Sequence, residues 1–251
     1  MWKPETRQLL IVLLVVFSAL AWLVLWLWGQ SPFGQFLGHH SLTLITEDIS
    51  PAPVFLIGWI VMIIAMMLPG SLPLIVQFDT LTRERSDHLY LLGWLIAGDL
   101  CSWMLFGGLV YVGSGLFRQI IEHSLWLEIN TWMFGALMAI LAGLYQLTRL
   151  KTYCRDKCCS VQVLIANYWQ RDATARRSLV LGLRHGWLSI GCCWLLMLLM
   201  FAVSAGSIGW MLILSVVMMG EKNLAWGRQL SIPLGTALLA GGVMALIFAA
   251  P

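Results

Sequence analysis

Several apolar stretches of this chain are long enough to cross a lipid bilayer and contain no Lys or Arg. An α-helix rises about 1.5 Å per residue, so about 20 apolar residues span the roughly 30 Å hydrocarbon core. Of the 251 residues, 60% are hydrophobic and 11% are charged, whereas soluble domains carry about 25% charged residues. The sequence therefore predicts an all-α fold, a polytopic transmembrane helical bundle that forms a single domain over residues 1–251. The net charge of +3 gives no indication of nucleic-acid binding.

The apolar stretches predict about seven membrane spans. The predicted spans are residues 9–28, 54–77, 89–113, 131–147, 179–203, 207–220 and 229–250. The sixth span is short. An alternative is that the fifth and sixth form a re-entrant hairpin that turns at residues 204–206, which would leave six spans.

The distribution of basic residues predicts the orientation. If the N-terminus is cytoplasmic, the seven-span topology puts every Lys and Arg except Arg118 on the inner side. Basic residues accumulate on the cytoplasmic side of membrane proteins. We therefore expect a cytoplasmic N-terminus and an external C-terminus.

Asp99 lies near the middle of the third predicted span. A charged carboxylate there costs on the order of 2.5–3.5 kcal/mol in membrane insertion. It should therefore be protonated, paired with a cation or bonded to a metal. The sequence leaves its role open.

The second predicted span contains potential soft-metal ligands beside a bend. Met62 and Met66 are four residues apart, so they share one helix face. Pro69 removes the hydrogen bond to the Ala65 carbonyl, and Pro73 removes the bond to the carbonyl of Pro69. The helix should therefore bend where its thioether side chains lie, an arrangement that suits a soft cation.

Cysteines supply further soft donors. Cys192 and Cys193 lie within the fifth predicted span, and Cys154 and Cys158 are one helical turn apart in the loop between residues 149 and 178, expected to be cytoplasmic. Thiolates and thioethers select Cu(I), and Cys also binds zinc. The alternative is that Met and Cys simply fill the apolar core.

Three weaker features complete the set of candidates. His185 lies at the predicted inner interface of the membrane. Gly182 and Gly186, on either side of it in the sequence, have a spacing that allows close helix packing. Glu221 opposes the helix dipole at the end of the sixth span, so it is expected to pair or to bind metal. The adjacent histidines at 39–40 could capture an external cation, although adjacent histidines in a loop are more often solvated.

Taken together, these segments resemble a bacterial family of predicted metal-binding integral membrane proteins, a domain of unknown function. The residues that carry the resemblance are Trp59, Met62, Ala65, Met66, Met67, Pro69, Pro73, Ala142 to Gln146, Lys151, Cys154, Cys158, Gly182, His185, Gly186, Gly191 to Trp194, Met197, Glu221 and Lys222. The chain departs from the family pattern at Cys159-Ser160 and at Trp226, where a proline is expected. The resemblance implies metal binding and a location in the bacterial inner (cytoplasmic) membrane.

We therefore expect an inner-membrane protein that binds a soft transition metal, most simply copper and otherwise zinc, for metal transport, trafficking or metalloenzyme assembly. Its partners would be the lipid bilayer, a metal ion and another membrane protein or metalloenzyme complex, with no catalytic residues assigned. Two alternatives remain, a structural or assembly subunit of a membrane complex and, less favoured, a thiol–disulfide relay enzyme. The candidate metal ligands are Met62, Met66, Met67, Cys154, Cys158, His185, Cys192, Cys193 and Glu221.

Overall fold

The computed structural model describes residues 4–30, 51–122, 131–168, 174–203, 208–224 and 226–248, and all regular secondary structure in them is α-helical. The predicted all-α class is confirmed. The histidines at 39–40 and the predicted turn at 204–206 lie outside the described residues. The helices are α1 (Pro4–Gln30), α2 (Pro51–Met66), α3 (Leu68–Thr82), α4 (His88–Glu122), α6 (Thr131–Gln146), α7 (Arg149–Cys159), α8 (Val161–Tyr168), α9 (Ala175–Val203), α10 (Ile208–Asn223) and α11 (Gly227–Phe248).

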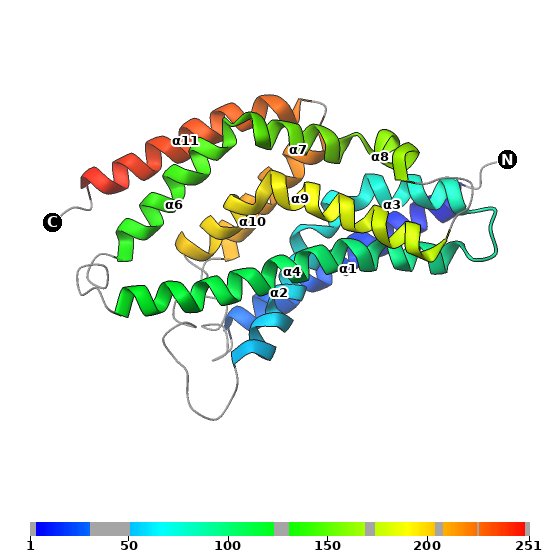
Figure 1. Ribbon diagram of the computed structural model, residues 1–251, viewed down its shortest axis with the longest axis horizontal. Coiled ribbons are helices and arrows are strands. Elements are labelled where there is room, and N and C mark those ends of the chain that lie inside the picture. The colour runs from blue at the N-terminus through cyan, green and yellow to red at the C-terminus, as the bar shows by residue number, and fades with distance from the viewer. Residues whose placement is uncertain are drawn as a thin grey trace.

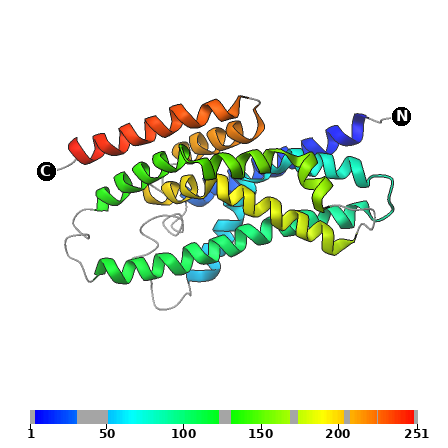
Figure 2. The same ribbon diagram turned by 45° about the horizontal axis from the view of Figure 1, so that its top comes forward.

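Helix α9 is the central element of the arrangement. It packs along α4 on one side and against α6 and α7 on the other. Helix α11 lies beside α6, and α1 packs on α2 and α3 (Figure 1). The turned view shows the α6–α11 pair as a layer above α9 and α4 (Figure 2). Helices α4, α6 and α7 thus make most of the contact with α9, and α8 and α10 also touch it.

The predicted number of seven spans is wrong. Among the described residues, four helical segments are long and apolar enough to cross a membrane, namely Gln8–Gln30, His88–Gly113, Ala175–Met200 and Gly227–Phe248. Two bent pairs, Pro53–Met66 with Leu68–Thr82 and Met133–Gln146 with Arg149–Cys159, raise the number to at most six. Helix α10 is the missing seventh, because 16 residues extend only about 24 Å.

The second predicted span breaks at Met67, next to the prolines that predicted a bend. Helices α2 and α3 meet there at 63°. The carbonyl of Ala65 accepts a hydrogen bond from Ser18 Oγ at 2.9 Å, and that of Pro69 accepts one from Asn223 Nδ2 at 3.5 Å. Side chains of other helices therefore satisfy both carbonyls that the prolines free, as a break in an apolar environment requires.

The fourth predicted span, residues 131–147, ends at a bend of 65° between α6 and α7. Thr148 caps α7, because its side chain accepts a hydrogen bond from the Lys151 backbone N–H at 3.3 Å. Such a cap satisfies one of the unpaired N–H groups at a helix start. The bend directs α7 along α9 and brings the loop cysteines against the centre of the fold.

Glycines allow α4 and α9 to approach closely. A Cβ atom at Gly98 would overlap the Leu179 carbonyl oxygen, and one at Gly182 would overlap the Leu95 carbonyl oxygen. The predicted role of Gly182 in close helix packing is confirmed.

We expect Gly98→Ala to destabilise the protein, because the added methyl group must push α4 away from α9. Overpacking of this kind costs about 1–3 kcal/mol. Gly93→Ala in the same helix is the matched control, because a Cβ there meets nothing within 4 Å. Thermal unfolding of both variants in detergent measures the difference, and equal stability of the two would contradict the close packing.

Candidate metal centre

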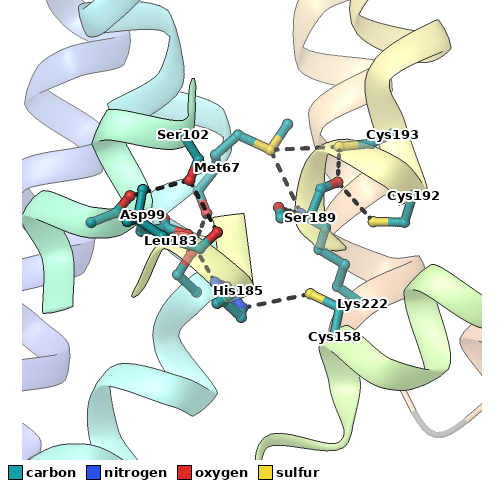
Figure 3. A network of polar contacts seen from close by, with 12 residues as sticks. Met67, Asp99, Ser102, Cys158, Leu183, His185, Ser189, Cys192, Cys193 and Lys222 are labelled. Carbon is teal, nitrogen blue, oxygen red and sulfur yellow. Dashed lines mark hydrogen bonds and ion pairs between the residues drawn. The ribbon is translucent and has the colours of Figure 1, made fainter. Parts of the chain in front are cut away.

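Four buried sulfur atoms from three separate parts of the chain meet beside α9. Met67 lies at the break between α2 and α3, Cys158 lies in the last turn of α7, and Cys192 and Cys193 lie on α9 (Figure 3). Each of these residues is at most 4% exposed. We call these four residues the sulfur cluster.

Hydrogen bonds hold the thiols of the sulfur cluster in place. Both Cys192 and Cys193 donate to the backbone carbonyl of Ser189, with Sγ–O distances of 3.1 and 2.9 Å. Cys193 Sγ is 4.0 Å from Met67 Sδ, and Cys158 lies beside Cys192. The adjacent cysteines on α9 thus share one acceptor and face sulfur atoms from two other segments.

Close contact between α7 and α9 places Cys154 near the sulfur cluster. A Cβ atom at Gly191 would lie only 2.8 Å from Cys154 Sγ, so this approach needs glycine. The Tyr145 hydroxyl donates to the carbonyl of Gly191. Cys154 therefore lies against the backbone that carries Cys192, one turn before Cys158 on α7.

His185 connects the sulfur cluster to the buried carboxylate of Asp99. His185 Nδ1 is 2.8 Å from Asp99 Oδ1, and His185 Nε2 is 3.5 Å from Cys158 Sγ. Ser71 Oγ also donates to Asp99 Oδ2 at 3.2 Å. A carboxylate on one ring nitrogen is the usual support of a metal-binding histidine, since it orients the other nitrogen. Asp99, whose role the sequence left open, is the carboxylate that supports His185 in this way.

Lys222, from the last turn of α10, reaches the same place. Its Nζ donates to Ser189 Oγ at 2.6 Å and lies 3.7 Å from Met67 Sδ. In the sequence, this residue stood out only as one of those that carry the family resemblance. Contact with the sulfur cluster depends on where α10 packs, which no local pattern indicates.

Glu221 forms a buried ion pair instead of facing the cysteines. Lys151 Nζ lies 2.7 and 2.8 Å from the two carboxylate oxygens of Glu221. Ser231 Oγ donates to Glu221 Oε1 at 2.9 Å. Lys151 is 2% exposed and Glu221 is 4% exposed. This pair joins α7, α10 and α11 next to the sulfur cluster. Of the two roles that the sequence left open for Glu221, pairing or metal binding, the structure shows the ion pair.

The remaining predicted methionines lie in the packed core. Met62 and Met66 are 1% and 2% exposed and belong to the same hydrophobic cluster as Cys192 and Cys193. Cys159, which was not among the candidates, is exposed, and its thiol donates to the Lys222 carbonyl at 3.2 Å. An exposed thiol therefore adjoins the buried Cys158 in the sequence.

The sulfur cluster provides the right kind of atoms for a soft metal ion. Thiols and a thioether with a supported imidazole beside them match the donors that Cu(I) and zinc prefer. Within the described ranges, no three His, Cys, Asp or Glu side chains stand together as a ready metal site. Binding by these residues would therefore require side-chain rotation.

We expect Glu221→Gln to destabilise the protein strongly, since it leaves the buried Lys151 ammonium without its counter-charge. Breaking a buried pair costs about 3–5 kcal/mol, or roughly 10 °C in apparent Tm. The double variant Lys151→Met/Glu221→Met should recover most of the loss.

The control is Asp87→Asn, which removes a carboxylate from the exposed pair of Arg85 and Asp87 at 2.8 Å. The hydrogen bond from Arg85 lowers the pKa of Asp87, but exposed pairs add little stability. A similar loss of Tm in Asp87→Asn and Glu221→Gln would contradict the importance of the buried pair.

Comparison with known proteins identifies a family for most of the chain. The model of the family PpoB2, described as "Copper chaperone", matches residues 56–245. This range includes the sulfur cluster, His185, Lys222 and the buried ion pair. No curated protein and no solved structure matches the chain. The match covers well over half of the sequence, and the chain belongs to this copper-chaperone family.

Proposed function

We propose that this chain is a multi-pass protein of the bacterial inner membrane that binds Cu(I) at the sulfur cluster and passes it on in copper trafficking or metalloenzyme assembly. The observation that carries the proposal is the meeting of Met67, Cys158, Cys192 and Cys193 in one buried place. Family membership supports copper as the cargo.

The spacing of the sulfur atoms supports a shared ion. Metal–sulfur bonds to thiolates are about 2.3 Å long for ions such as zinc, so two sulfurs on one ion are separated by roughly 4 Å. Cys193 Sγ and Met67 Sδ are already 4.0 Å apart. Neutral Met ligands bind weakly beside thiolates, which suits an ion that must be released again.

The arrangement of cysteines supports a route between the surface and the sulfur cluster. Cys159 is exposed, Cys158 is buried and lies beside Cys192, and Cys154 lies against Gly191. Because thiolates exchange Cu(I) by sharing it between neighbouring sulfurs, a row of cysteines allows transfer in short steps. In this proposal Cys154, Cys158 and Cys159 form the loading side, and Cys192 and Cys193 form the buried side.

The exposed surface of α1 supports a membrane location. Leu9, Leu13 and Phe17 are 62%, 57% and 54% exposed, and the segment Gln8–Gln30 has a mean hydropathy of 2.9. Apolar side chains that cover a whole helix are stable in lipid and unfavourable in water.

Purified protein in detergent under reducing conditions should bind about one Cu(I) per chain, measured by elemental analysis after titration. The double variant Cys192→Ser/Cys193→Ser should lose this copper, because it removes two ligands. Cys101→Ser is the matched control, since Cys101 is an exposed thiol on α4. If the protein binds zinc and not copper, the proposed cargo is wrong. If the folded protein binds neither metal, the proposed function is wrong.

The orientation is tested with a thiol reagent that cannot cross membranes. In a Cys101→Ser background, we expect Cys159 in intact bacterial cells to react only after the inner membrane is permeabilised, because α7 and α8 are proposed to lie on the cytoplasmic side. Labelling of Cys159 in intact cells with an accessible outer membrane would place this face outside and refute the proposed topology.

A further inference from the structure

The ammonium group of Lys222 and the thiols of the sulfur cluster share two neighbours. Lys222 Nζ lies 3.7 Å from Met67 Sδ and donates a hydrogen bond to Ser189 Oγ at 2.6 Å (Figure 3). Met67 Sδ also lies 4.0 Å from Cys193 Sγ. The carbonyl of Ser189 accepts the hydrogen bonds of the Cys192 and Cys193 thiols. The positive charge is therefore held directly beside the atoms proposed to bind copper.

The buried carboxylates in this part of the fold are paired with other residues. Glu221 is paired with Lys151 at 2.7 Å, and Asp99 is paired with His185 at 2.8 Å. Within the described part of the chain, Lys222 forms no ion pair with a carboxylate. While the thiols are protonated, the metal-free sulfur cluster thus adjoins a positive charge that no carboxylate compensates.

Copper binding supplies the missing negative charge. Cysteine binds metal ions as the thiolate, so the thiol proton leaves when the metal arrives. Two thiols that take up one Cu(I) release two protons to the solvent, and the two thiolates with the monovalent ion carry one negative charge. The thioether of Met67 adds no charge. One ammonium group beside this unit makes the site neutral, and opposite charges a few ångströms apart attract strongly in a medium of low dielectric constant.

The ammonium group also has donors for the thiolates. A deprotonated cysteine can no longer donate to the Ser189 carbonyl, and its sulfur becomes a hydrogen-bond acceptor. An ammonium group has three N–H donors, of which the Ser189 hydroxyl takes one. The aliphatic part of Lys222 runs along Gly70, where a Cβ atom would lie 3.1 Å from Lys222 Cδ. This packing keeps the charged end directed at the sulfur cluster.

We propose that Lys222 is the counter-charge of the copper site: its ammonium group stabilises Cu(I) held as an anionic unit by the thiolates of Cys192 and Cys193. Lys222 keeps its proton throughout, so both released protons come from the thiols. It is a positioning residue and not a ligand, and the inference rests on the proposed function.

The Cu(I) affinity of full-length variants in detergent tests the counter-charge. Competition with a chromophoric Cu(I) chelator at one pH, under reducing conditions, gives the affinity. Lys222→Gln should bind Cu(I) at least about tenfold more weakly than the wild type, because the anionic unit loses its counter-charge. Lys222→Arg keeps the charge and should retain most of the affinity. The matched control is Lys157→Gln, which removes an exposed lysine next to Cys158 in the sequence and should bind like the wild type.

The thermal stability of the metal-free variants separates this role from a structural one. Lys222→Gln should leave the metal-free Tm unchanged or raise it, because the charge that it removes has no carboxylate partner. A residue needed mainly for folding would instead lower the metal-free Tm when it is replaced.

The outcomes also separate the inference from the proposed function. If the wild type binds no copper, both fail. If the wild type binds copper and Lys222→Gln binds it equally well, the counter-charge is refuted while copper binding stands. The same conclusion follows if Lys222→Arg binds as weakly as Lys222→Gln, or if Lys222→Gln lowers the metal-free Tm as much as Glu221→Gln does.

Discussion

The break between α2 and α3 determines where the sulfur cluster forms. Pro69 prevents an unbroken helix from passing through this point, and the 63° bend leaves Met67 at the corner, facing Cys193. The bend is tolerated because Ser18 and Asn223 satisfy the carbonyls that the prolines free. A straight helix would carry the Met67 side chain away from this corner, so the thioether owes its place beside α9 to a backbone defect.

Polar groups in the interior are organised around the same corner. Asp99 and His185 pair across the tightly packed α4–α9 interface, and Lys151 and Glu221 pair between α7 and α10. A buried carboxylate without a partner is costly, and both of these carboxylates have one. Each pair therefore also fixes the position of a helix, and the paired residues are next to Cys158 or Lys222.

The sequence predicted the helical class, the proline bend and the cysteines of the sulfur cluster, because spacing and residue type reveal these directly. It predicted seven spans because α10 is apolar, although its 16 residues are too few to cross the bilayer. The contacts of Lys222 and the pairing of Asp99 with His185 could not be predicted, since they join residues far apart in sequence through helix packing. Only the free-energy cost of burying a charged carboxylate indicated that Asp99 had a partner.

The neighbouring residues Glu221 and Lys222 illustrate how one helix end serves two purposes. Successive residues on an α-helix point about 100° apart, so the two side chains face different neighbours. Glu221 reaches Lys151 on α7 and Ser231 on α11, whereas Lys222 reaches Ser189 on α9 and Met67. The buried pair anchors the end of α10, and this anchor sets how far the Lys222 ammonium extends into the sulfur cluster. The two side chains therefore link the end of α10 to α7 and α11 on one side and to α9 and Met67 on the other.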